Sequence, residues 1–171
     1  MESLLYALIS AVIYPDFFSM FKYKMNSKLQ SDLDFGFKSE DESMPYLESI
    51  FGKLKKTEQY NKFDYLNDKC KIELKTRKCR FGQYPDLYFE LGKIKEGIKF
   101  KKDNPDKKVF FIWRCLYTSD KEEGFYYWEL NEEEVNTGYG GRNDRGRDEY
   151  KILVKIKNKY IKPLFSHKPT L

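Results

Sequence analysis

Residues 63–77 constrain the fold more than any other stretch of the sequence, because their pattern predicts two short strands joined by a polar turn. The segment runs Phe-Asp-Tyr-Leu-Asn-Asp-Lys-Cys-Lys-Ile-Glu-Leu-Lys-Thr-Arg, and its polar break at residues 67–69 is typical of a β-hairpin. A two-residue loop at Asp68 and Lys69 sets a register with the apolar pairs on one face and the charges on the other, as a half-buried sheet requires. In this register Leu66 faces Lys71, Tyr65 faces Ile72, Asp64 faces Glu73 and Phe63 faces Leu74.

The predicted register brings two acidic side chains together. Asp64 and Glu73 become cross-strand neighbours with Cβ atoms about 5 Å apart, and like charges in that position destabilise a sheet. A divalent cation such as Mg²⁺ would remove the conflict, because it takes carboxylate oxygens. Lys75 projects from the same face as Glu73. Two carboxylates and an ammonium suit phosphodiester hydrolysis, in which a metal activates water and the lysine holds that water or the developing charge.

The order of these residues resembles the motif of the PD-(D/E)XK nuclease superfamily, which includes many restriction enzymes and Holliday-junction resolvases. Asp64 followed by Glu73-Leu74-Lys75 matches its D…(E/D)-x-K pattern, and Glu48 stands where members often carry a further acid on a preceding helix. Phe63 departs from the motif, because the proline of the name would stand there, although that position varies in the superfamily. The resemblance covers residues 43–130, about half of the chain.

The resemblance implies an α/β fold of the restriction-endonuclease type, with a mixed central β-sheet flanked by helices. It also implies a Mg²⁺-dependent nuclease acting on DNA, with Mn²⁺ able to substitute and a homodimer as one form. Asp64, Glu73 and the carbonyl of Leu74 would ligate the metal, with Glu48 as a direct or water-mediated third acid. Lys75 would orient the nucleophile and stabilise the pentacovalent transition state. The residues expected to contact nucleic acid are Gln83, Tyr84, Lys93, Arg142, Arg145 and Arg147.

Each of these features also has an ordinary structural interpretation. Alternating Lys and Glu on a hairpin is most often a solvated face with loose ion pairs. Glu48 suits the first turn of a helix, where the helix dipole favours an acid, and residues 137–147 suit either a phosphate-wrapping loop or a surface loop. Two other classes therefore stay open. One is an inactive nuclease-fold protein that binds nucleic acid or serves as a structural virion component, and the other is a protein-interaction module.

Composition favours one globular domain in a reducing, intracellular setting, cytoplasmic, nuclear or viral. A chain of 171 residues with 40% hydrophobic residues can bury a core and is too apolar for a disordered chain. The net charge of +5 is compatible with a polyanionic partner without requiring one. Three cysteines without CxxC spacing and a single histidine, His167, exclude multi-histidine metal sites and hydrolase triads. The apolar run at residues 4–14 is too short to span a membrane.

The remaining elements are predicted from periodicity and turn residues. We expect a helix over residues 1–24 broken near Pro15, a polar connector over 26–41, and a helix that begins at Ser43 with Pro45 in its first turn. A second helix is expected from Asp86, with Leu87, Leu91, Ile94 and Ile98 facing the core. Strands are expected at 109–117, 124–130 and 150–157, and a loop at 137–147. The predicted organisation is an N-terminal helical extension (1–42), a nuclease-like core (43–160) and a loose tail (161–171).

Overall fold

The computed structural model describes residues 15–58, 61–116, 124–132, 135–141 and 150–165, with side chains from residue 28 onward. A six-stranded sheet is made of β1 (Lys55–Lys56), β2 (Tyr65–Leu66), β3 (Cys70–Arg77), β5 (Lys108–Cys115), β6 (Gly124–Glu129) and β9 (Lys162–Phe165). A three-stranded sheet is made of β4 (Asp86–Glu90), β7 (Asn136–Gly140) and β8 (Lys151–Lys157). The helices are α2 (Pro15–Phe51), α3 (Leu91–Asp103) and the short 3₁₀ helix η2 (Asn158–Tyr160).

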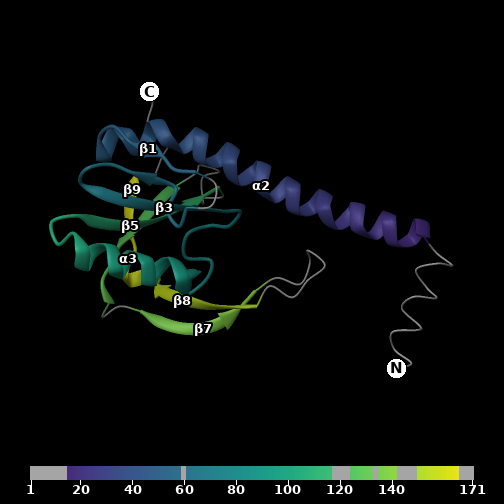
Figure 1. Cartoon of the computed structure of the whole chain (residues 1–171). Coiled ribbons are helices and arrows are strands. Elements are labelled where there is room, and N and C mark those ends of the chain that lie inside the picture. Colours follow the sequence, from purple (N-terminus) through teal and green to yellow (C-terminus); the bar gives the residue numbers. More distant parts are fainter. Residues whose placement is uncertain (1–14, 59–60, 117–123, 133–134, 142–149, 166–171) are drawn as a thin grey trace.

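The six-stranded sheet is mixed, as the sequence predicts for this α/β fold. Its strand order is β1-β2-β3-β5-β6-β9, and only β3 and β5 run parallel, while every other pair is antiparallel. The smaller sheet has the order β4-β8-β7 and is antiparallel throughout. Figure 1 shows α2 on one side of the central strands, and α3 with β7 and β8 on the other.

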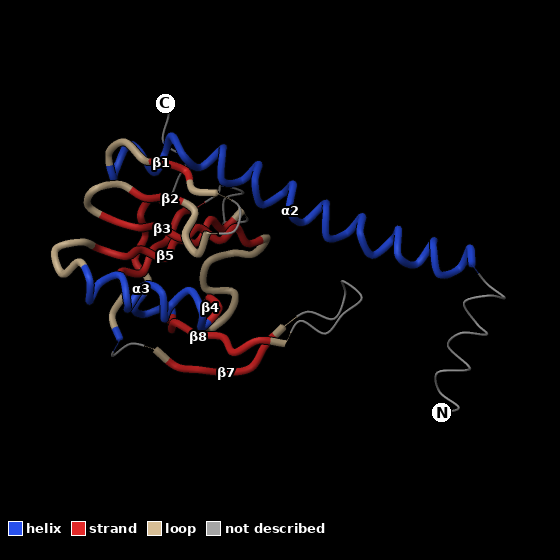
Figure 2. The backbone as a smooth tube through the Cα atoms, viewed as in Figure 1, coloured by secondary structure: helices blue, strands red, loops and turns tan. Residues whose placement is uncertain are grey.

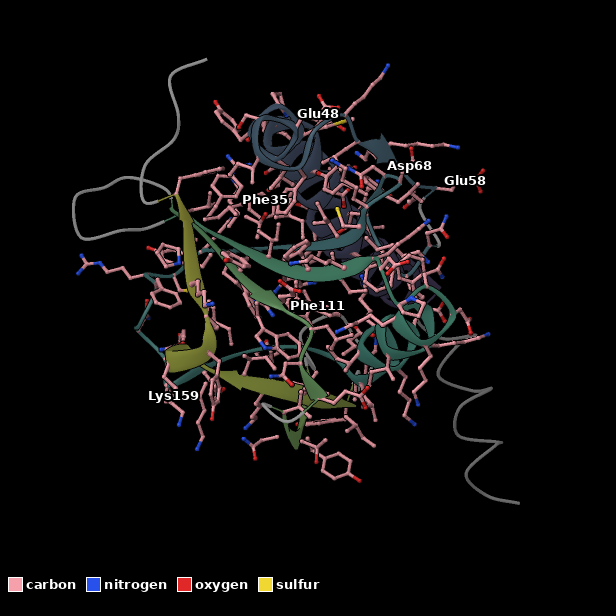
Figure 3. The ribbon with its side chains drawn as sticks, turned by 90° about the vertical axis from the view of Figure 1, so that its left-hand side faces the viewer. Phe35, Glu48, Glu58, Asp68, Phe111 and Lys159 are labelled. Atoms are coloured by element: carbon pink, nitrogen blue, oxygen red, sulfur yellow. The ribbon has the colours of Figure 1, made fainter. Side chains whose placement is uncertain are left out.

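Both faces of the central sheet are covered, and β5 shows this most clearly. Phe110 and Ile112 pack with the α2 residue Leu47, whereas Phe111 and Trp113 pack with α3 and the smaller sheet. Figure 3 labels Phe111 in the middle of the domain. A run of apolar residues without alternation is what a doubly covered strand requires. The predicted central strand is therefore confirmed.

The hairpin register is confirmed for the pairs that form it, but its predicted solvent face is wrong. Tyr65 pairs with Ile72, and Leu66 pairs with Lys71. The paired part of β2 ends at Tyr65, where the Asp64 N–H donates to the Ile72 carbonyl at 3.0 Å. Glu73 is buried because α3 covers this part of the sheet face, whereas Lys75, two residues farther along β3, is exposed.

Helix α2 is continuous where a connector was predicted. It runs from Pro15 to Phe51, through residues 26–41 and through the expected boundary at 42/43, and it extends well beyond the sheets (Figures 1 and 2). Ser43 is inside the helix, where its hydroxyl donates to the Ser39 carbonyl at 2.6 Å and caps nothing. Polar residues break the apolar periodicity here because much of this helix lies in solvent, so the pattern resembled a connector.

The helix predicted from Asp86 begins five residues later. Asp86–Glu90 is strand β4, in which Leu87 and Phe89 are buried while the alternate residues Tyr88 and Glu90 are exposed. Ile94 is buried in α3, and Leu91 and Ile98 pack partly against the same core. Leu87 fits the helical spacing only by chance, because residues four positions apart lie on the same face in a strand as well as in a helix.

Two predicted irregular segments contain strands. The expected loop at residues 137–147 begins in β7, and its residues 142–147 lie outside the described chain. The expected tail contains β9, which pairs with β6 and brings the Phe165 ring to 4.9 Å from that of Phe125. The strand predicted at 150–157 is β8, so it is not the last one. In the described chain, none of the helices is long and apolar enough to cross a membrane.

Candidate active site

The two acidic residues of the predicted motif lie side by side in the structure. Glu73 lies in the middle of β3 with 2% of its surface exposed. Asp64 precedes β2, and its Oδ2 accepts a hydrogen bond from the Leu74 N–H at 2.7 Å. This bond anchors the Asp64 carboxylate to the strand residue next to Glu73. The proximity that the hairpin register predicts is therefore present, and both the Asp64 side chain and the backbone bond from the Asp64 N–H to the Ile72 carbonyl maintain it.

Lys93 joins the acidic pair from the first turn of α3. Its Nζ donates to Glu73 Oε1 in a close ion pair. The other carboxylate oxygen, Glu73 Oε2, is buried and has no hydrogen-bond partner among the described residues. A buried carboxyl oxygen without a partner is unfavourable unless a proton, a further positive charge or a donor reaches it.

Burial and the neighbouring charges shift the pKa values of all four groups. Burial raises the pKa of Asp64, against the opposing effect of Lys93 and the Leu74 N–H. Burial, and then the charge of Asp64, raises the pKa of Glu73 well above its ordinary value. Lys75 reaches solvent, but desolvation in the cleft and then Arg77 lower its pKa. Burial would lower the pKa of Lys93, yet the carboxylates of Glu73 and Asp64 raise it overall. Opposite shifts within one cluster are typical of catalytic sites.

A third acid comes from α2, and it is Glu40. Burial, followed by the charge of Asp64, raises the pKa of Glu40. Lys56 pairs with its Oε2 at 3.1 Å, and the buried Tyr65 hydroxyl donates to its main-chain carbonyl at 2.6 Å. Because Tyr65 follows Asp64 in the chain, this bond ties the backbone beside Asp64 to α2. Glu40 was not predicted from the sequence, because it falls in the stretch expected to be a connector.

The structure does not bring Glu48 to the carboxylates. Eight residues separate it from Glu40, which is about 12 Å along a helix. Its Oε1 accepts a hydrogen bond from the Leu54 N–H at 2.9 Å, just after α2 ends, and Figure 3 labels it at the top of the view, over that end of the helix. Glu48 therefore stabilises the turn that follows α2. Its two predicted roles were different, a third acid of the metal site or an acid in the first turn of a helix.

Buried contacts hold the Glu40 segment of α2 against the sheet. Arg114 of β5 is 4% exposed and donates to the Ser39 carbonyl at 3.2 Å and to Ser39 Oγ at 3.1 Å. It also pairs with Glu42 at 2.9 Å, while the Ser39 hydroxyl contacts that of Thr76 on β3. Ser39 and Thr76 adjoin Glu40 and Lys75 in the chain, so these bonds align two elements of the site.

Two clefts meet at this cluster. The larger, which we call the α2 cleft, has a volume of about 680 Å³ and lies between residues 31–40 of α2 and the end of β3. The smaller, the β4 cleft, has a volume of about 140 Å³ and is lined by β4, β8 and the end of β7. The residues common to both clefts are Glu73, Lys75, Arg77 and Lys93. Glu73 and these three cations therefore border both clefts, whereas Asp64 borders only the α2 cleft.

The residues predicted to contact nucleic acid are distributed unevenly. Lys93 lies in the acidic cluster itself. Gln83 and Tyr84 lie on an exposed loop, where Gln83 Oε1 accepts from the Arg80 N–H at 3.2 Å, and neither lines the α2 or the β4 cleft. Arg142, Arg145 and Arg147 lie outside the described residues, shortly after Gly141 in the β4 cleft. The cations that the sequence analysis did not single out are Arg77, Lys78 and Lys151.

A mixed sheet between helices, with paired acids and a lysine two residues along a central strand, defines a nuclease domain of the restriction-endonuclease type. Residues 19–162 match the sequence profile of a family described as phage putative PDDEXK endonuclease. This match covers well over half of the chain, so the protein belongs to that family. A comparison with curated proteins found no match to the sequence.

Proposed function

We propose that the protein is a Mg²⁺-dependent endonuclease that hydrolyses DNA phosphodiester bonds at the cluster of Asp64, Glu73 and Lys75. The observation that supports this most directly is the Glu73 carboxylate, whose Oε2 is buried beside Asp64 without a partner in the described part of the chain. Two adjacent carboxylates in a poorly solvated site favour a ligand that brings positive charge. A hard divalent cation supplies that charge and accepts carboxylate oxygens.

The available donors fit Mg²⁺ better than a cation that needs a full protein cage. Among the described residues, no group of three or more His, Cys, Asp or Glu side chains is arranged to hold a metal. Mg²⁺ commonly binds through one or two carboxylates and completes its coordination with water and phosphate oxygens. Asp64 and Glu73 would hold it, with the Leu74 carbonyl as a further ligand and Glu40 acting through a bound water. When bound, Mg²⁺ polarises the phosphate and lowers the pKa of a bound water.

The side chains of the cluster have separate tasks in this proposal. Lys75 orients the attacking water and stabilises the negative charge that develops on the phosphate, because it lies in both clefts beside the acids. Its lowered pKa makes proton transfer easier than from an ordinary lysine. Lys93 balances the charge of Glu73, and Arg77 is placed to contact a phosphate next to the reacting one.

Cleavage of supercoiled and branched DNA in Mg²⁺ or Mn²⁺ tests the proposal. Asp64→Ala and Lys75→Ala should each reduce cleavage by about 10²-fold or more, the usual effect of removing one group that stabilises the transition state. Lys69→Ala is the matched control, because Lys69 is an exposed lysine in the turn before β3. Wild-type protein that binds DNA and cuts none of these substrates would instead support an inactive nuclease-fold binder.

A further inference from the structure

The α2 cleft has a wall that the proposed chemistry does not use. Residues 31–33 and 35–37 of α2 line it, opposite the end of β3. The cleft continues from this wall directly to Asp64 and Glu73. A strand bound at the carboxylates can therefore lie along the wall with its neighbouring nucleotides.

Each of the two aromatic residues of this wall, Phe35 and Phe37, has a lysine ammonium beside its ring. The Lys78 ammonium lies 4.5 Å from the centroid of the Phe35 ring, and that of Lys56 lies 5.8 Å from the Phe37 ring. Phe35 is half-buried, and Figure 3 labels it between α2 and the strands. Aromatic faces next to cations are the combination that binds single-stranded nucleic acid, since the rings stack on bases and the cations neutralise phosphates.

The size and charge of the cleft fit an unpaired strand. Clefts of roughly 300–1,000 Å³ enclose a molecule of drug size, so the α2 cleft, at about 680 Å³, has room for a nucleotide or two. Lys75, Arg77 and Lys78 supply positive charge along β3. The acids Glu40, Asp64 and Glu73 belong to the metal-binding cluster, and Asp32 is the remaining acid of the cleft.

We infer that the α2 cleft binds an unpaired segment of the DNA substrate next to the scissile phosphate, with a base stacked on Phe35. The preferred substrate is then DNA with a single-stranded part, such as a flap, an overhang or a branch, and not a continuous duplex. This inference rests on the proposed nuclease function and specifies the substrate of that site.

Binding measured without cleavage tests it. Fluorescently labelled single-stranded DNA, a blunt duplex of the same sequence and a duplex with an overhang are titrated with full-length protein in Ca²⁺, which takes similar oxygen ligands to Mg²⁺. The two DNAs with unpaired nucleotides should bind more tightly than the blunt duplex. Phe35→Leu should weaken their binding about tenfold, the loss of one stacked base, and Phe35→Tyr should restore it. Ile50→Ala is the control, because Ile50 is an exposed apolar residue of α2 outside the cleft.

The outcomes separate this inference from the proposed function. Equal binding of duplex and single strand, or equal effects of Phe35→Leu on both, would overturn the unpaired-strand site even if the protein cuts DNA. Tighter binding of the same single strand made of RNA would overturn its assignment to DNA. Preferential binding of single-stranded DNA through Phe35, without cleavage in Mg²⁺ or Mn²⁺, would support the site while contradicting the nuclease activity.

Discussion

Asp64 and Glu73 combine two features that destabilise ionised carboxyl groups, which are removal from water and the closeness of a like charge. Both carboxyl groups have raised pKa values, with burial as the first cause in each. A raised pKa means that the folded protein binds protons more tightly than the unfolded chain, so the ionised pair opposes folding above the folded pKa. That penalty disappears as the pH falls below the unfolded pKa. Ionisable residues that lower the stability of the folded protein in this way are typical of functional sites.

Asp64→Asn should therefore stabilise the protein when no divalent cation is present. The amide keeps an acceptor for the Leu74 N–H and removes the repulsion with Glu73 and Glu40. We expect a gain of about 0.5–1 kcal/mol at neutral pH, which is roughly 2 °C in melting temperature. The gain should shrink as the pH falls, because the wild-type carboxylates become protonated. Thermal melts in EDTA over a pH series measure it.

Addition of Mg²⁺ to the same samples provides the control. Wild-type protein should melt at a higher temperature in Mg²⁺, since a ligand that binds the folded state stabilises it, and Asp64→Asn should respond less. A variant that is less stable than wild type at neutral pH in EDTA would contradict the charge-repulsion argument. Equal responses to Mg²⁺ would contradict Asp64 as a metal ligand.

At the scale of elements, the position of α2 decides which acid joins the site. Arg114 and Tyr65 both bind α2 next to Glu40, from strands that are distant in sequence. The local sequence pattern gave no indication of these bonds, because serines such as Ser39 and Ser43 suggest a solvent-exposed segment. In the structure the Arg114 guanidinium donates hydrogen bonds to both hydroxyl groups. The hairpin, in contrast, depends on residues within fifteen positions, and its register was predictable.

Tyr65→Phe tests whether α2 positions Glu40. The substitution removes one buried hydroxyl, keeps the packed ring and should lower the free energy of unfolding by about 0.5–1.5 kcal/mol. If Glu40 acts on the metal, half-maximal cleavage should require more Mg²⁺. Denaturant unfolding and a Mg²⁺ titration of cleavage measure the two effects. Tyr127→Phe on β6 is the control, and a stability loss without a change in the Mg²⁺ requirement would make Tyr65 only structural.

At the scale of the whole molecule, the acidic cluster lies on a central sheet that is covered on both faces. The α2 cleft and the β4 cleft open to solvent beside this cluster. The strand β9 completes this arrangement, because it covers the edge of β6 and packs Phe165 on Phe125. Its Pro163 lacks a backbone donor, which makes β9 a poor template for further strands. Removing β9 would expose the open edge of β6.

A chain ending at Ile161 should therefore be less stable than one ending at Phe165 and should self-associate. Phe125 would lose cover and the β6 edge would lose its hydrogen-bonded partner. We expect a loss of about 2–4 kcal/mol, typical of removing a large aromatic residue and its neighbours from a core. Denaturant unfolding and size-exclusion chromatography of the two chains measure it. A monomeric chain of unchanged stability would show that β9 is dispensable.

The sequence by itself determined the hairpin register, the central and aromatic strands, and the pair Asp64 and Glu73 with Lys75 nearby. Each of these depends on alternation or apolar runs within a few residues, where side-chain direction follows from the backbone. Only the tertiary structure decided that α2 continues through residues 26–41, that Asp86–Glu90 is a strand, that Glu40 joins the site, and that Lys93, which was predicted to contact nucleic acid, pairs with Glu73. Those outcomes depend on partners tens of residues away, such as Arg114 for Ser39 and Glu73 for Lys93, whose energies no local pattern contains.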